Sequence, residues 1–347
     1  MSRIRFFAAV SAALIAFSAV SCSHKINVND DTDNSVTTTV TGEGEKETAS
    51  DNKNKAADDI NSYIKVKQAK PAMWKVTDTK TGNEIYMLGM LRFATEYTFA
   101  MPDYVNDIYN KCSGIAIELN MADVPQDQLE EFYTHWIYTD GTTIQDHISK
   151  ETYKTAREYL TENLYYNEMA ENNIANGWAS QVNAVAISKV KGLIFETLDT
   201  SFTGKAKLDG KDIVGLEDIM TQLKGIDACS DELSDFMISD TIRRGNDIAA
   251  FTANLADQHD SWAKGDVDAL AEELYWGDRP HDLDDDYEAY LKVNLYDRNE
   301  SMAEKAEDFL KNGDKYLIIV GVTHFSGEKG VDDILKEKGY KVERVDK

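Results

Sequence analysis

The sequence YMLGMLRF at residues 86–93 returns in pattern near the other end of the chain, as LIIVGVTHF at residues 317–325. Each copy is an apolar run typical of a buried strand, followed by a glycine, two residues, a nitrogen-bearing side chain and phenylalanine. A glycine where a strand ends lets the backbone turn tightly, at the edge where open α/β sheets place their sites. The second copy offers His324 there, whereas the first offers Arg92, which stays protonated and cannot bind a metal.

After each copy the sequence has first a helix-like stretch and then a further strand-like run, so the order of elements is the same in both places. We expect the strand of the first copy to form a hairpin with the strand before it. One more short strand is expected in the middle of the chain. The expected strands cover residues 73–76, 84–88, 114–119, 212–217, 317–320 and 340–345, and the expected helical regions cover residues 104–112, 125–191, 231–310 and 330–338. Strands that alternate with helices at both ends predict an α/β fold, with a central sheet built from N- and C-terminal half units, flanked by helices, and a large helical insertion.

The first residues have the pattern of a targeting segment. Arg3 and Arg5 precede an apolar run at residues 6–20 that is short for a membrane span. The run ends in AVSC, which resembles a bacterial lipoprotein cleavage box with Cys22 as the lipid-modified terminus, although Ala19 stands where leucine is usual. An ordinary secretory signal cut near the same point is the alternative. We therefore expect an extracytoplasmic protein that is lipid-anchored to the bacterial membrane.

The pattern divides the chain into three parts, a lipoprotein signal peptide at residues 1–21, a disordered tether at residues 22–61 and a folded domain at residues 62–347. The tether contains no aromatic residue and is rich in Ser, Thr, Asn, Asp, Lys and Glu. Such a segment cannot bury enough apolar surface to offset its ordering entropy, so it predicts a flexible connection between membrane and domain.

The net charge and the cysteine content exclude some classes of binding partner and site. The formal net charge of −25 argues against nucleic acid and anionic lipid surfaces as partners of the folded part, because both are negatively charged. Two cysteines remain after Cys22, at positions 112 and 229, and neither lies in a Cys-x-x-Cys spacing. We expect Cys112 and Cys229 to be core residues, and the sequence leaves open whether they form a disulfide.

Four of the expected strands end near a chemically useful side chain: Arg92, Glu118, Glu217 and His324. If the strands lie side by side, these groups converge at one sheet edge, where His and carboxylate ligands suit a divalent metal that activates water. An arginine opposes cation binding and favours an anion, which it grips with two parallel hydrogen bonds. Structural roles stay open, since the carboxylates could cap segments, Arg92 could form a structural ion pair, and His324 could be a bonded core residue.

At these residues the chain resembles the TraB/GumN family, which is related to the Tiki metalloproteases. The resemblance covers most of the folded part, from Trp74 onward. Its motifs are Trp74-Lys75-Val76, the strand at residues 86–89, Ile117-Glu118, Leu198-Asp199-Thr200, Gly210-Lys211, Gly215-Leu216-Glu217, Trp262-Ala263-Lys264-Gly265-Asp266, Arg298-Asn299 and Gly321-Val322-Thr323-His324. So many features in one order make the resemblance fairly specific.

The resemblance implies a site that holds manganese or cobalt in a metal-dependent peptidase acting on secreted proteins. It assigns His324 and Glu118 to the metal, Glu118, Glu217 and Arg298 to catalysis, and Arg298 to substrate binding as well. The first Gly-x-x-His motif is degenerate, because Arg92 stands where the family has histidine. A fixed positive charge in place of an imidazole is expected to weaken binding of a divalent metal severely.

Two functional hypotheses follow, and a third alternative assigns no functional site to the sheet edge. The first is a lipid-anchored relative of metal-dependent peptidases with weakened or altered hydrolase activity. The second is a pseudoenzyme that binds a peptide or another anionic ligand through Arg92 without turning it over. The third is a surface interaction protein whose sheet edge is only structural. A peptide or secreted protein is the expected partner or substrate under the first two.

Overall fold

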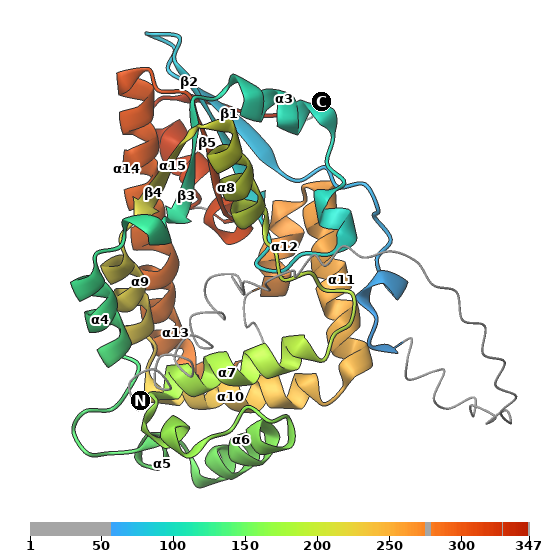
Figure 1. Cartoon of the computed structure of the whole chain (residues 1–347), viewed down its shortest axis with the longest axis vertical. Helices are drawn as coiled ribbons and strands as arrows, with labels where there is room; N and C mark the ends of the chain where they lie inside the picture. Colours follow the sequence, from blue (N-terminus) through green and yellow to red (C-terminus); the bar gives the residue numbers. More distant parts are fainter. Residues whose placement is uncertain (1–56, 275–278, 328, 346–347) are drawn as a thin grey trace, which may run out of the picture.

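The computed structural model describes residues 57–274, 279–327 and 329–345. The structure contains a six-stranded sheet with strand order β4-β3-β5-β2-β1-β6, which lies in the upper part of the view in Figure 1. The strands are β1 (Met73–Thr77), β2 (Glu84–Met90), β3 (Gly114–Leu119), β4 (Asp212–Glu217), β5 (Tyr316–Gly321) and β6 (Lys341–Arg344). All six lie where the sequence places them, to within two residues at the ends.

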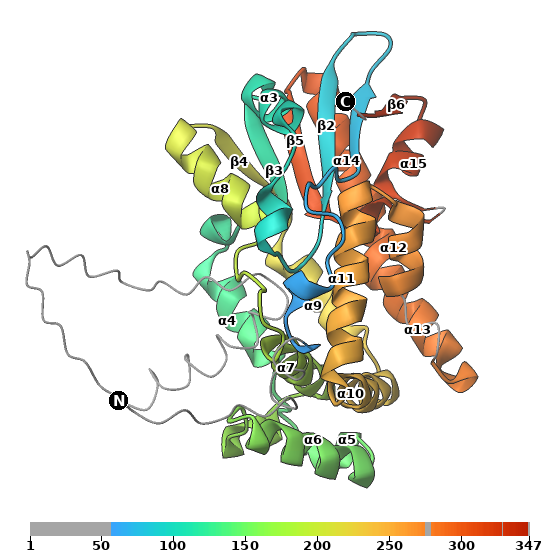
Figure 2. The same cartoon turned by 90° about the vertical axis from the view of Figure 1, so that its right-hand side faces the viewer.

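Helices cover both faces of the sheet and extend well beyond it (Figures 1 and 2). The α-helices are α3 (Asp103–Lys111), α4 (Gln126–Thr134), α5 (Ile144–His147), α6 (Lys150–Glu162), α7 (Ala175–Ser188), α8 (Leu198–Asp209), α9 (Ile219–Asp227), α10 (Asp231–Gly245), α11 (Ile248–Lys264), α12 (Val267–Leu274), α13 (Asp284–Leu291), α14 (Asp297–Asn312) and α15 (Val331–Glu337). Shorter helical turns that matter below are η1 (Ile60–Ser62), η2 (Glu96–Phe99), the π-helix η6 (Lys292–Tyr296) and η7 (Val322–Phe325).

The two half units meet at the middle of the sheet, where β2 and β5 pair in parallel. The first unit runs β2-α3-β3 and the second runs β5-α15-β6, while β1 is antiparallel to both β2 and β6. Gly89 lies opposite Val320, so the two motif glycines are offset by one residue in the register. This arrangement confirms the predicted α/β fold with a sheet built from both ends of the chain.

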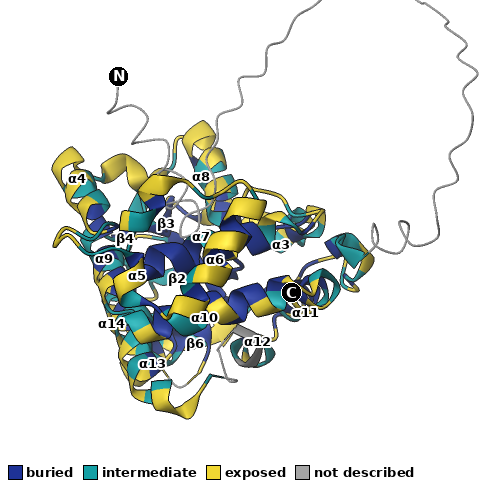
Figure 3. Ribbon diagram, turned by 90° about the horizontal axis from the view of Figure 1, so that it is seen from below, coloured by how far each residue is buried: buried dark blue, intermediate teal, exposed yellow. Residues whose placement is uncertain are grey.

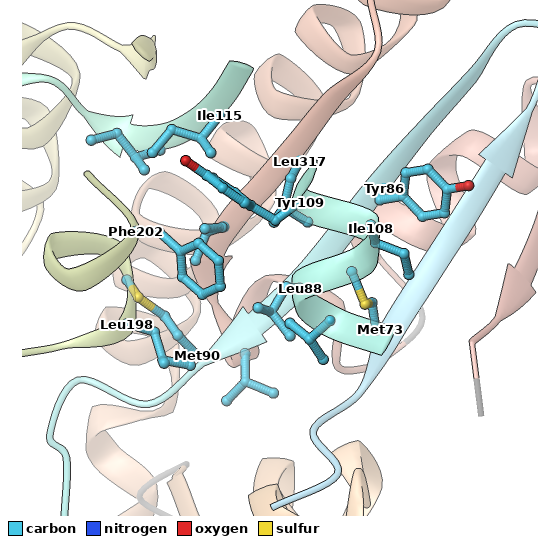
Figure 4. Close-up of a cluster of buried hydrophobic side chains, with 14 of the residues drawn as sticks. Met73, Tyr86, Leu88, Met90, Ile108, Tyr109, Ile115, Leu198, Phe202 and Leu317 are labelled. Atoms are coloured by element: carbon cyan, nitrogen blue, oxygen red, sulfur yellow. The ribbon is translucent and has the colours of Figure 1, made fainter. Parts of the chain in front are cut away.

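Alternating strand residues face two separate cores. On one face, Ile115, Leu88 and Leu317 pack against α3, α8, α11 and α12 (Figure 4). On the other face, Ala116 and Ile318 pack against α14 and α15. Because side chains point to opposite faces with a period of two, continuous apolar runs in the sequence are what a sheet buried on both faces requires.

The helical insertion is built largely from the regions that the sequence predicted. Ser149 caps α6 as expected, since its side-chain oxygen accepts a hydrogen bond from the Thr152 N–H at 3.1 Å. Helices α8 and α9 lie outside the predicted helical regions. Helix α8 buries only a narrow stripe of Leu198, Phe202 and Ala206, which is too sparse a pattern to stand out from the sequence.

Distinct apolar clusters hold the insertion together, and the largest joins α6, α7, α10 and α13. Figure 3 shows exposed residues on the outward sides of these helices and buried residues on the sides that face inward. Cys112 lies in the core beside β3, and Cys229 packs against the cluster of α7 and α10; both are free thiols, as expected of core residues. None of the helices in the described part of the chain is long and apolar enough to span a membrane.

The packed part of the chain begins slightly before the expected boundary at residue 62. Ile60 is fully buried with Ile64, Phe251 and Ala256, and its N–H donates to the Lys191 carbonyl at 3.1 Å. The predicted signal peptide, Cys22 and most of the tether lie outside the described residues.

Candidate functional site

The carboxyl ends of β2, β3, β4 and β5 lie at one edge of the sheet because these strands are mutually parallel. Arg92, Glu118, Glu217 and His324 come from those ends. Arg298 comes from the first turn of α14 and reaches the same edge, where it contacts two of the carboxylates. The structure thus brings together the five residues that the sequence pointed to, around the buried side chain of Glu118.

Each oxygen of Glu118 accepts hydrogen bonds from nitrogen donors. Oε2 accepts from the Nη2 atoms of Arg92 and of Arg298, both at 2.9 Å, and Oε1 accepts from the Gly321 N–H at 2.8 Å. Burial alone would raise the pKa of Glu118, but the charges of Arg92 and Arg298 hold that pKa well below its usual range. Glu118 is therefore ionised and fully engaged, which suits an anchor better than a proton acceptor.

Gly321 allows the close approach of this carboxylate to the end of β5. A Cβ atom there would stand 3.2 Å from Glu118 Oε1, against the side chain that its own N–H binds. The absence of a side chain at Gly321 thus leaves room for the hydrogen bond to Glu118, in addition to allowing the tight turn after β5.

Arg298 and Glu217 form a two-point ion pair. The Nε and Nη2 atoms of Arg298 lie 2.7 and 2.9 Å from the two oxygens of Glu217, and Gln222 donates to one of those oxygens at 2.7 Å. Burial raises the pKa of Glu217 above its ordinary value, and the charge of Arg298 opposes that rise. The pair is inaccessible, since the exposed fractions of the two side chains are 9% and 0%.

A π-helical turn between α13 and α14 helps to hold Arg298. Asn294 lies in this turn, and its carbonyl accepts from Arg298 Nη1 at 3.0 Å. Single π-helical turns inside α-helices are frequent at functional sites because they redirect backbone groups. Sequence periodicity did not reveal this turn, and it gave no role to Asn294 or Gln222.

His324 lies on η7, is 1% exposed, and has its Nδ1 atom 2.6 Å from Asn299 Oδ1. Asn299 also donates through Nδ2 to the Lys329 carbonyl at 2.7 Å, which fixes its oxygen toward the imidazole. Nδ1 therefore carries the proton, and Nε2 faces Glu118 Oε1 at 3.8 Å with a lone pair. Burial lowers the pKa of His324 to about 3, so the ring is neutral near pH 7. The sequence showed Asn299 beside Arg298 without indicating this partnership.

Arg92 is the accessible member of the group. Its side chain is 45% exposed, compared with 8% for Glu118 and 9% for Arg298. The turn that carries it is held by two hydrogen bonds, from Trp262 Nε1 to the Gly89 carbonyl at 2.9 Å and from the Ile194 N–H to the Ala94 carbonyl at 2.8 Å. The guanidinium shares Glu118 Oε2 with Arg298, and Arg92 occupies the position where the resemblance places the first-motif histidine.

As arranged, these residues do not fit a divalent metal. The oxygens of Glu118 and Glu217 already accept hydrogen bonds from Arg92, Arg298, Gly321 and Gln222, so a metal would have to displace these donors and sit beside two guanidinium charges. Within the described residues, no three or more His, Cys, Asp or Glu side chains form a group that could hold a metal.

A comparison with models of known protein families identifies a relationship that covers most of the described residues. The model of the TraB/PrgY/gumN family matches residues 72–344, a range that includes all six strands and all five site residues. The chain therefore belongs to the TraB/PrgY/gumN family. The comparisons of this chain with the curated proteins and with the solved structures found no match.

Proposed function

We propose that this protein binds the carboxylate of a peptide at the sheet edge through Arg92, and that it does not hydrolyse the peptide by a metal-dependent route. The observation that carries this proposal is the position of Arg92, whose guanidinium binds Glu118 at 2.9 Å while 45% of the side chain stays accessible. An arginine that one carboxylate already orients is pre-organised to receive another, because its planar fork carries five N–H donors.

The charges of the neighbouring groups favour Arg92 as the point of contact. Arg298 is covered by Glu217 and Glu118 on its own side, and His324 is neutral, so Arg92 is the positive group that a ligand would meet first. The net charge of −25 repels anions at long range. A peptide or protein segment with a terminal carboxylate and basic residues upstream suits both conditions better than a small anion does.

Weakened or altered hydrolysis is the second candidate. It is favoured by the neutral imidazole of His324, whose Nε2 lone pair faces Glu118 Oε1 at 3.8 Å. The family resemblance would assign a manganese or cobalt ion to His324 and Glu118, with Glu217 as general base and Arg298 binding the substrate. Arg92, which departs from the family pattern, would help Arg298 to hold the substrate. Glu118 would first have to exchange its present hydrogen-bond donors for a metal, and we therefore place this function second.

A peptide-retention experiment separates the two candidates. The purified protein is immobilised and exposed to a random peptide library with free carboxyl termini, and to the same library with amidated termini. We expect retention of the free acids alone, loss of retention in Arg92→Ala, and no loss in Arg243→Ala. Arg243 is a matched control because it is also an exposed arginine, 66%, paired with a buried aspartate, Asp240. Equal retention of both libraries would contradict carboxylate binding, and peptide cleavage that requires manganese would support hydrolysis instead.

We also propose that the protein is exported and anchored to the membrane by a lipid on Cys22, with the following residues as tether. The support is the apolar run that ends in AVSC at residues 19–22. In cells grown with labelled palmitate, we expect label in the wild-type membrane fraction. The Cys22→Ser variant is expected to lose the label, and an equally labelled variant would rule the anchor out.

A further inference from the structure

Tyr290 lies on the same helical run that carries Arg298. Its carbonyl accepts a hydrogen bond from Asn294 Nδ2 at 3.2 Å, and the Asn294 carbonyl accepts one from Arg298 Nη1 at 3.0 Å. The three residues are four positions apart and are linked by these bonds. They therefore follow one another from α13 through the π-helical turn to the start of α14. Figure 1 shows α13 below α14, toward α7 and α10.

The aromatic ring of Tyr290 packs on the helical insertion. It lies against the apolar cluster of α6, α7, α10 and α13, as does Cys229, and it stacks with Tyr287 at 6.3 Å between ring centroids. The ring is therefore held by the insertion, while the helical run that carries it leads to the sheet edge through Arg298.

The hydroxyl of Tyr290 is a polar group that the protein leaves without a partner. Within residues 57–274, 279–327 and 329–345 it has no hydrogen-bond partner, and it is not one of the hydroxyls sealed from solvent. Burial raises the pKa of Tyr290 above its ordinary value, and the positive charges of Arg298 and Arg92 oppose that rise. Because charges are screened at longer range, this effect indicates that the hydroxyl lies near both arginines.

The surroundings of this hydroxyl suit a ligand that accepts hydrogen bonds. Tyr290 is only partly exposed, and burial dominates its pKa, so the phenol lies in a recess that water still reaches. A hydrogen bond to a ligand is stronger in such surroundings than in open water. Arg92 is the accessible cation nearby, since Arg298 is covered by Glu217 and Glu118. A carboxylate has two oxygens, so it can bind a guanidinium and a phenol at once.

We infer that Tyr290 binds the ligand together with Arg92: the guanidinium pairs with one oxygen of the terminal carboxylate of a peptide, and the Tyr290 O–H donates to the other. This inference rests on the proposed function and adds a specificity-determining residue to it. Tyr290 comes from the insertion and Arg92 from the turn after β2, so the bound carboxylate would connect the insertion with the sheet edge.

The experiment measures the binding of dye-labelled peptides to the purified full-length protein by fluorescence anisotropy. The probes are lysine-containing pentapeptides that end in alanine, as free acid and as amide, and we expect wild type to bind the acid more tightly. Tyr290→Phe keeps the ring and removes only the hydroxyl, and it should weaken binding of the acid about tenfold. Tyr165→Phe is the matched control, since Tyr165 is a 42% exposed tyrosine of the insertion, and it should bind as wild type does.

The salt dependence of binding separates direct contact from a structural role of Tyr290. A phenol donates a hydrogen bond without carrying charge, so Tyr290→Phe should keep the salt dependence of wild type while its affinity falls. Arg92→Gln removes the charge and should lose most of the salt dependence. If Tyr290 only positioned Arg92, its removal would change the salt dependence as well, and direct contact would be wrong.

The failure of this inference is distinguishable from failure of the proposed function. If wild type prefers the acid and Arg92→Gln loses that preference, while Tyr290→Phe binds the acid as tightly as wild type, the assignment of Tyr290 is wrong and carboxylate binding by Arg92 stands. If wild type does not prefer the acid over the amide, both proposals fail. Urea unfolding of each variant beside wild type shows that a loss of affinity does not reflect unfolding.

Discussion

Arg92 and Arg298 bind the same oxygen of Glu118, each through its Nη2 atom at 2.9 Å. One arginine follows β2 and the other lies on α14, and they differ in accessibility, with 45% and 9% of the side chains exposed. One carboxylate thus connects a buried ion-pair network with an arginine at the surface.

Arg298→Leu should destabilise the protein far more than Arg92→Leu. Removing Arg298 leaves Glu217 and Glu118 buried without their principal partner, which typically costs about 3–5 kcal/mol. Removing the half-exposed Arg92 should cost no more than about 1 kcal/mol, because solvent screens it and Glu118 keeps two other donors. Urea unfolding of the two variants beside wild type measures both values, and equal losses would contradict the conclusion that Arg298 is the more deeply buried ion-pair partner.

Arg92→His should create affinity for manganese or cobalt that wild type lacks. The change removes a positive charge and adds an imidazole beside Glu118 and the Nε2 lone pair of His324. Elemental analysis after dialysis against the metal gives the readout. Arg92→Gln serves as control because it removes the charge without adding an imidazole. Metal retention should also disappear when His324→Ala is combined with Arg92→His, and equal retention by the histidine and glutamine variants would contradict the prediction.

The stability of the protein should fall as the pH falls from about 6.5 toward 3, in part because of His324. Burial lowers the pKa of His324 to about 3, so the unfolded state takes up this proton first on acidification and is thereby favoured. His324→Asn should flatten the dependence between about pH 6 and pH 5 by up to about 1.4 kcal/mol per pH unit.

Other buried groups also change the stability of the protein in this pH range. The test therefore compares wild type with His324→Asn in the slope of unfolding free energy against pH. Burial lowers the pKa of His259, which works in the same direction as His324, and burial raises the pKa of Glu217, which works in the opposite direction. These contributions are common to wild type and His324→Asn. Urea unfolding at several pH values gives the slopes, and parallel slopes would show that His324 is protonated or accessible in the folded state.

Gly225→Ala should destabilise the protein by about 1–3 kcal/mol, whereas Gly204→Ala should be neutral or stabilising by up to about 1 kcal/mol. A Cβ atom at Gly225 would collide with the side chain of Asn294, which is held by hydrogen bonds to the Gly225 and Tyr290 carbonyls at 2.9 and 3.2 Å. Gly204 lies in α8 with open space around it. Thermal and urea unfolding test the pair. Similar effects of both substitutions would mean that the contact between α9 and the π-helical turn is not tightly packed.

Much of the architecture follows from local patterns. Apolar runs marked all six strands, and the Ser149 cap and the helical periodicity marked α6. Helices α8 and α9 were missed: α8 buries only three residues in a narrow stripe, and the nine residues of α9 are too few for a periodic pattern to stand out.

The convergence of the site was predictable, and an ion pair of Arg92 was one of the alternatives that the sequence left open, but the partners of Arg298 and His324 were not indicated. Parallel strands put Arg92, Glu118, Glu217 and His324 at one edge, as their positions after apolar runs indicated. The predicted catalytic and metal-binding roles of these residues and of Arg298 remain predictions. The structure adds that Asn299 sets the tautomer of His324, a relationship between residues 25 positions apart that no spacing rule reveals.

The sequence by itself determined that two glycine-containing half units build the sheet, and that an arginine stands three residues after the first glycine where a histidine stands three residues after the second. These features are encoded in short runs of neighbouring residues, because side-chain volume and backbone freedom determine locally where a strand forms and where it turns. Only the tertiary structure decided that both arginines share one carboxylate oxygen and that one of them stays accessible. That outcome depends on contacts between residues 26 and 180 positions apart, because hydrogen-bond partners and burial are set by three-dimensional distance rather than by order along the chain.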